Sequence, residues 1–170
     1  MYGTYCHQQP RSGIRGVTHG LAGFTIVELM TTMAVVAILA SIAVPSFNAF
    51  TAQQRVKTVS SDLYLAMSKA RSEAVKRNGN IVIQPLDPSL GWQGGWGIWD
   101  PVGNAYLDRR STATDTTIAT AAGTITYQAS GRILGGAPVQ FQVSSSHATA
   151  HPRCLQLDPS GRPYLKAMAC

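Results

Sequence analysis

One ionisable side chain stands where only apolar residues would be expected. Glu28 is the only charged residue in the segment 24–47, which reads FTIVELMTTMAVVAILASIAVPSF. As a helix this segment is about 36 Å long, enough to cross the hydrocarbon core of a bilayer. An ionised carboxylate in that environment costs several kcal/mol unless an opposite charge compensates it. A carboxylate at this position therefore indicates a functional site whose chemistry is charge pairing.

Two histidines and a cysteine have a spacing that could suit a metal ion. His147, His151 and Cys154 lie close together, but Pro152 and the lack of a helical pattern around them argue against a metal site. Cys154 is better explained as a disulfide partner. No Ser-His-Asp, paired-carboxylate or phosphate-loop pattern is evident. The sequence therefore predicts no enzyme, no catalytic residue, no metal and no cofactor.

The segment 1–23 that precedes the apolar run has the character of a leader. It contains no acidic residue and no apolar run, as expected of a processing segment. An ordinary secretory signal carries its apolar run inside the part that is removed, whereas here the run follows the segment. Arg11 and Arg15 lie on the N-terminal side of the run. The positive-inside bias thus predicts a cytoplasmic N-terminus, with everything beyond residue 46 on the other side of the membrane.

A second helical pattern continues from the apolar run and differs from it in being amphipathic. Within 51–78 the apolar residues recur at intervals of three and four, and Asn78-Gly79 supplies a stop. Pro45 lies between the two parts, where it removes a backbone donor and predicts a kink or local loosening. We expect one bent helix of more than fifty residues. Its core-facing stripe is Ala52, Val56, Val59, Leu63, Ala66, Ala70 and Ala74.

The rest of the chain reads as short strands between Gly, Pro and Asp turns. We expect an antiparallel sheet, in two layers or as one curved sheet, packed on the stripe of the helix. Two turns repeat one form, 129–132 (ASGR) and 159–162 (PSGR), and 111–123 is expected to be a loose connection. The predicted strands cover 80–84, 95–99, 124–128, 139–143, 154–157 and 163–165.

The sequence GFTIVE at 23–28, followed at once by an apolar helix, resembles the signal of type IV pilins and type II secretion pseudopilins. The resemblance implies cleavage between Gly23 and Phe24 by a membrane-embedded prepilin peptidase and N-methylation of Phe24. It also implies that Glu28 neutralises the terminal amine of a neighbouring subunit during assembly. Pro45 falls where pilins usually carry a proline.

Three further stretches resemble the FimT, FimU and GspH branch of minor pilins and pseudopilins: 65–77 (LAMSKARSEAVKR), 95–100 (GWGIWD) and 125–132 (ITYQASGR). The resemblance implies an α+β, type IV pilin-like fold, with a long N-terminal helix packed on a C-terminal antiparallel sheet domain. The expected domains are a leader at 1–23, a transmembrane and polymerisation helix at 24–50, and a GspH/FimT-like globular domain at 51–170.

The cysteines suit an exported domain. If 1–23 is removed, Cys6 is lost and Cys154 and Cys170 remain. In an oxidising compartment the expected fate of this pair is a disulfide, which the loop-entropy model values at about 3 kcal/mol, whereas a cytosolic domain would keep two free thiols. The resemblance favours the bridge, because pilins often close their C-terminal loop in this way.

A mild excess of positive charge leaves room for a polyanion partner. Lys and Arg outnumber Asp and Glu by 14 to 8, or by 12 to 8 without the leader. Some FimT-type proteins bind DNA through a C-terminal Gly-Arg-x-Arg element, and here Tyr164 replaces the second arginine. Non-specific DNA binding would rest on the cations and the aromatic ring of this region. The candidate residues are Arg153, Arg162, Tyr164 and Lys166.

These patterns predict a minor type IV pilin that takes part in pilus assembly or its initiation at the tip. The alternatives are a minor pseudopilin of a type II secretion system and a pilus-displayed DNA receptor for natural transformation. The expected partners are other pilin or pseudopilin subunits, the prepilin peptidase and the inner membrane, with DNA as a further candidate. The expected location is the bacterial inner membrane, crossed once with the globular domain in the periplasm, and then the filament.

Overall fold

The computed structural model describes residues 23–112, 115–146 and 150–170. The chain divides into two compact units, Met1–Ala40 and Ser41–Cys170, and the helix α1 (Ile26–Arg77) contributes to both. The predicted helix of more than fifty residues is thus confirmed, with 52 residues. By length and composition, α1 is the one helix among the described residues that could cross a membrane.

The start of α1 is fixed by a side-chain cap. Thr25 Oγ1 accepts a hydrogen bond from the backbone N–H of Glu28 (3.1 Å), and the carbonyl of Thr25 accepts one from Leu29 (3.1 Å). Threonine at the cap followed three residues later by glutamate is the spacing of a capping box. The apolar side chains that follow are exposed along the helix as far as Phe47. This part of α1 therefore has no core of its own.

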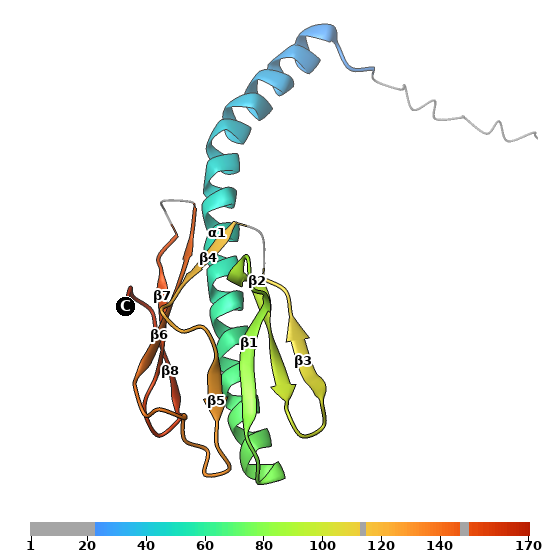
Figure 1. The fold of residues 1–170 in the computed structure, drawn as a ribbon. Coiled ribbons are helices and arrows are strands. Elements are labelled where there is room, and N and C mark those ends of the chain that lie inside the picture. The colour runs from blue at the N-terminus through green and yellow to red at the C-terminus, as the bar shows by residue number, and fades with distance from the viewer. Residues whose placement is uncertain (1–22, 113–114, 147–149) are drawn as a thin grey trace, which may run out of the picture. The chain divides into compact units, whose positions relative to one another are not determined.

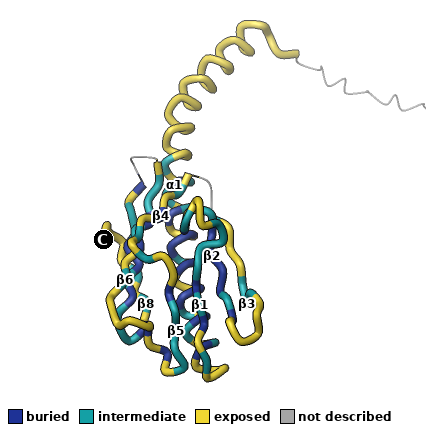
Figure 2. Tube along the Cα trace, viewed as in Figure 1, coloured by how far each residue is buried: buried dark blue, intermediate teal, exposed yellow. Residues whose placement is uncertain are grey.

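In the second unit α1 becomes a core helix. All seven residues of the predicted stripe are buried, and Ser60 and Met67 join them. The buried hydroxyl of Ser60 donates to the carbonyl of Val56 at 2.6 Å, so its polar group is satisfied within the helix. The predicted amphipathic face is thereby confirmed, and Figure 2 shows the buried positions of α1 beside the strands.

The helix ends at the predicted place by a defined backbone motif. Asn78 takes a left-handed conformation (φ 49°), its N–H donates to the carbonyl of Val75, and the N–H of Gly79 donates to the carbonyl of Ala74. These two bonds form a Schellman motif, which satisfies carbonyls that the helix end would leave unpaired. Asparagine, rather than the glycine, occupies the left-handed position.

Eight strands form two four-stranded antiparallel sheets. The first sheet has the order β3-β2-β1-β5 and the second β4-β6-β7-β8. Figure 1 shows both sheets beside the same stretch of α1. The first sheet consists of β1 (Ile81–Asp87), β2 (Gly91–Asp100), β3 (Ala105–Arg110) and β5 (Ile125–Tyr127). The second consists of β4 (Thr116–Ala119), β6 (Val139–Ser145), β7 (Arg153–Leu157) and β8 (Pro163–Lys166).

The six predicted strands are all present, and two further strands, β3 and β4, were not predicted. The expectation that 111–123 is a loose connection is wrong, because β4 lies within it and pairs with β6 through residues 116–119. Both strands stand at a sheet edge, where one side needs no partner and few apolar residues are required. In β4 only Ile118 is buried, and in β3 no residue is fully buried.

The two sheets share one core with the helix. Trp92 of β2 packs edge-to-face on Phe141 of β6, with ring centroids 4.8 Å apart, and so joins one sheet to the other. The indole N–H of Trp92 donates to the carbonyl of Ala122 at 2.7 Å. Buried side chains of both sheets, such as Ile83 and Leu155, belong to the same cluster as the α1 stripe.

The two repeated turns have the same hydrogen bonds and lie against each other. In each, a residue donates to the carbonyl four positions on, and the glycine N–H donates back to that residue's own carbonyl. Gly131 (φ 74°) and Gly161 (φ 81°) occupy equivalent positions. A Cβ added to Gly161 would collide with the carbonyl oxygen of Gly131, and Arg71 Nε donates to that same oxygen at 3.1 Å. The two turns therefore lie in close contact, and the first of them is hydrogen-bonded to α1.

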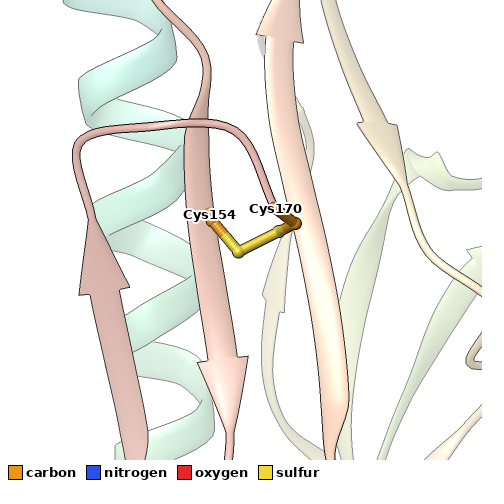
Figure 3. The surroundings of a disulfide bond; sticks show 2 residues. All are labelled: Cys154 and Cys170. Atoms are coloured by element: carbon orange, nitrogen blue, oxygen red, sulfur yellow. A yellow bond between two sulfur atoms is a disulfide. The ribbon is translucent and has the colours of Figure 1, made fainter.

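The predicted disulfide is present. Cys154 in β7 is joined to Cys170, and the two Cα atoms lie 5.0 Å apart. Figure 3 shows how the segment after β8 passes across β7 to bring Cys170 to its partner. The sulfur of Cys154 is buried under this segment. The bridge thus holds the C-terminus against the outer face of the second sheet.

Replacing Gly161 with alanine is expected to lower the free energy of unfolding by about 3–5 kcal/mol, because backbone strain of 1–3 kcal/mol adds to overpacking of similar size. Gly136 is the matched control, since it has a similar φ of 64° and open space around its missing Cβ. Gly136→Ala should cost only about 1–2 kcal/mol. Urea denaturation of the segment 51–170 measures both, and equal losses would refute the close contact of the two turns.

Removing the bridge with Cys170→Ser should destabilise the same segment by about 3 kcal/mol, through the entropy that the unfolded chain regains. The bridge spans a sequence separation of 16, so the expected loss is moderate. Dithiothreitol should shift the denaturation midpoint of the unmodified segment and leave the variant unaffected. A reductant effect of equal size on both proteins would contradict the assignment.

Candidate assembly and interaction surfaces

The predicted cleavage and assembly residues lie together at the start of the described chain. Gly23 and Phe24 precede α1 and are exposed, and nothing lies within 4 Å of the position a Cβ would take on Gly23. Such an open, thin backbone can enter a protease active site. Phe24 is 83% exposed. The sites of cleavage and methylation stay predictions.

Glu28 lies in the first turn of α1, and its carboxylate is exposed. Its backbone N–H is bonded to Thr25, but within the described residues its carboxylate has no hydrogen bond or ion pair. A negative charge at a helix N-terminus interacts favourably with the helix dipole. This term is smaller than the cost of burying a carboxylate in lipid. The predicted role of Glu28 in subunit assembly stays a prediction.

Pro45 lies inside α1, and the residues around it are exposed and helical. A proline inside a helix removes one backbone donor. The predicted kink or local loosening at this position stays a prediction.

The four candidate DNA-binding residues do not lie on one surface. Directly opposed residues of antiparallel strands point to the same face of a sheet. Arg153 is opposed to the buried Val143 and so belongs to the helix-facing side of the second sheet. Tyr164 and Lys166, opposed to 156 and 154, belong to the outer face, and Arg162 precedes β8. The structure thus brings three of the four residues to one hairpin and places Arg153 on the other face.

Asp158 organises this hairpin. Its carboxylate accepts hydrogen bonds from Ser160 Oγ (2.6 Å), the backbone N–H of Arg162 (3.0 Å) and the hydroxyl of Tyr164 (2.9 Å). These bonds, that of Ser160 first, lower the pKa of Asp158 to about 2. Because the folded state lowers this pKa, the carboxylate stabilises the fold above its usual pKa near 4, and the contribution is lost as the pH falls toward 2. The same carboxylate raises the pKa of the Tyr164 hydroxyl.

The spacing of His147, His151 and Cys154, which the sequence already argues against as a metal site, receives no support from the described part of the chain. His147 lies outside the described residues, and Cys154 is bound in the disulfide. The backbone N–H of His151 donates to Gln53 Oε1 at 2.7 Å, which ties the start of β7 to α1. No group of three metal-binding side chains is found among the described residues.

Comparison with known proteins places these features in a family. The family described as type II transport protein GspH matches residues 60–161, which is more than half of the chain. No curated protein sequence matches the chain. Residues 65–77, 95–100 and 125–132, which resemble this branch, all lie inside the matched region.

Solved structures of pilins and pseudopilins have the same fold. The minor type IV pilin FimU of Pseudomonas aeruginosa is 24% identical with a TM-score of 0.60, and the match covers 69% of this chain and 92% of FimU. The minor pseudopilin EpsH from the type 2 secretion system of Vibrio cholerae is 9% identical with a TM-score of 0.54, and the match covers 66% of this chain and 97% of EpsH. The long apolar helix, the two antiparallel sheets and the family match agree: this chain belongs to the GspH family of type IV pilin-like minor pilins and pseudopilins.

Proposed function

We propose that this protein is a minor subunit of a type IV pilus and acts at or near the tip, where it helps to start assembly. The observation that carries the proposal is the first part of α1, whose apolar side chains are exposed while the rest of the chain has a closed core. Such a surface needs lipid before assembly and the helices of other subunits afterwards. No catalytic role is proposed.

Glu28 supplies the direction of assembly in this proposal. Cleavage after Gly23 gives Phe24 a positive terminal amine, which N-methylation leaves positively charged. In lipid, an unpaired carboxylate and an unpaired ammonium group both have a high free energy, and an ion pair between them lowers it. In this proposal the amine of the incoming subunit pairs with Glu28 of its neighbour, as the resemblance to type IV pilins implies.

The pilus is favoured over the pseudopilus by the comparison with solved structures. FimU shares more sequence with this chain than EpsH does, 24% against 9%, and has the higher TM-score. The second candidate, a minor pseudopilin of a type II secretion system, is supported by the family match to GspH. Both candidates require the same anchor and the same mode of assembly.

The same proposal includes a location in the inner membrane and a set of partners. The chain crosses the inner membrane once, with a cytoplasmic N-terminus and a periplasmic domain, and the prepilin peptidase acts on it there. The disulfide supports an oxidising compartment for the domain. DNA binding by Arg162, Tyr164 and Lys166 stays a prediction from the sequence, and the position of Arg153 on the opposite face gives it no support.

Deleting the gene in its own host should strongly reduce surface pili and leave type II secretion intact. Because the proposed subunit starts filaments, the few pili that remain in the deletion strain should be of normal length. In cells that carry the gene, an antibody against the protein should label one end of a sheared pilus. The unmodified gene supplied in trans is the control. Loss of secretion with normal piliation would instead assign the protein to the pseudopilus.

Two substitutions should separate processing from assembly. Gly23→Leu should leave the uncleaved precursor in the membrane, because a bulky residue blocks the peptidase site. Glu28→Leu should be cleaved normally but enter filaments at least about tenfold less, since the neighbour's amine then lacks a counter-charge in lipid. Immunoblots of membranes and sheared pili measure both. Cleavage of Gly23→Leu, or normal incorporation of Glu28→Leu, would contradict the mechanism.

A further inference from the structure

A groove of about 590 Å³ runs along one flank of the second part of α1, where the helix meets the start of β8. Three cations line it, and no carboxylate does. The cations come from two elements, since Arg71 and Lys76 belong to α1 while Arg162 precedes β8. The remaining lining residues are Tyr64, Ser68, Ser72, Val75, Pro163 and Tyr164.

Hydrogen bonds hold the groove in shape and leave its cationic groups available to a ligand. Arg71 is anchored through Nε to the carbonyl of Gly131, and among the described residues its two terminal nitrogens have no hydrogen-bond partner. Asp158 fixes the backbone of Arg162 and the hydroxyl of Tyr164. In the part of the chain that the structure describes, Lys76 Nζ forms one ion pair, at 4.0 Å, with Glu73. Little order has to be created when a ligand binds, which favours affinity.

The walls have the composition of a protein interface. Tyr64, Val75 and Tyr164 are 37%, 53% and 46% exposed, which leaves apolar surface in water between the cations. Tyrosine and arginine are the residues that interfaces use most often for strong contacts. The combination predicts a partner that brings an apolar contact and at least one carboxylate.

A second copy of this chain does not offer such a partner, because its own carboxylates are engaged. Of the eight Asp and Glu side chains, six accept hydrogen bonds or form ion pairs within the chain, and among the described residues only Glu28 and Asp62 do not. Glu28 belongs to the membrane segment, and Asp62 lines a different hollow beside Lys69 and Arg110. The complementary charge therefore comes from another protein.

A protein fits this groove better than DNA does. Cations that follow a nucleic-acid backbone form a track along a surface. Here the three cations surround one hollow, which suits a single carboxylate side chain with apolar contacts better than an extended phosphate backbone.

We propose that this groove binds an acidic segment of a different filament subunit, whose carboxylate is received by Arg71, Lys76 and Arg162. The proposal rests on the proposed function in one respect only, which is that the protein assembles with other subunits. The groove thereby selects a neighbour that differs from this chain, and contact between two copies at this site is disfavoured.

The test uses carbodiimide on cells of the native host that express the full chain, because this reagent joins a lysine amine to a carboxylate in direct contact. Mass spectrometry should identify a peptide in which Lys76 is linked to an Asp or Glu of another pilin or pseudopilin subunit. Arg162→Gln should reduce the yield of this cross-link about tenfold, as expected for the loss of one charged hydrogen bond.

The matched control is Arg132→Gln. Arg132 occupies in the repeated turn 129–132 the position that Arg162 occupies in the turn 159–162. It is exposed and does not line the groove. It should leave the cross-link yield unchanged. Both variants should keep the disulfide between Cys154 and Cys170, which reports that the domain has folded.

Four results would overturn the proposal: a cross-link from Lys76 to a second copy of this chain, no cross-link to another subunit, an equal effect of the two variants, or binding of a fluorescent DNA duplex that Arg162→Gln weakens while Arg132→Gln does not. A cross-link to a secretion pseudopilin in cells with normal pili would instead refute the pilus assignment and keep the groove. Loss of pili on deletion, without any cross-link, would keep the pilus assignment and refute the groove.

Discussion

The burial of one face of α1 is the constraint on which the domain depends. The stripe from Ala52 to Ala74 is almost completely inaccessible, and four of its seven residues are alanines, so strands can approach the helix closely. A single helix face covered by two sheets leaves the opposite face without a partner in the monomer. Tyr64, Leu65 and Val75 are exposed on the helix for this reason. The surfaces available for assembly follow directly from how the core is closed.

The second sheet has ties to the rest of the domain besides its packing on α1. The repeated turns 129–132 and 159–162 are in contact, and Arg71 of α1 donates a hydrogen bond to the first of them. The disulfide holds the end of the chain over β7. These interactions hold the β7–β8 hairpin at its turn and the segment that follows it. A hairpin held at several points keeps its backbone in a fixed position, so little backbone entropy is lost on binding.

What the sequence could predict was decided by helical periodicity and by turn residues. The stripe of α1 has a clear period, the six predicted strands lie between Gly, Pro and Asp turns, and each was found. The strands β3 and β4 gave no comparable signal, because an edge position requires few apolar residues. The repeated turns were visible as a motif, but their contact depends on residues thirty positions apart in the chain. The face on which Arg153 lies was equally hidden, since it depends on the register between β6 and β7.

The two proposed interactions solve different physical problems. Pairing of Glu28 with an amine in lipid would be strong, because neither charge has water to compete for it. Every subunit that carries the same acid and the same amine would make the same pair, so this interaction drives assembly without choosing a neighbour. Choice requires a surface on which the wrong neighbour lacks a complementary charge. That surface has to lie in the domain, where subunits differ, and the groove beside α1 has the rigidity and the unbalanced charge to provide it.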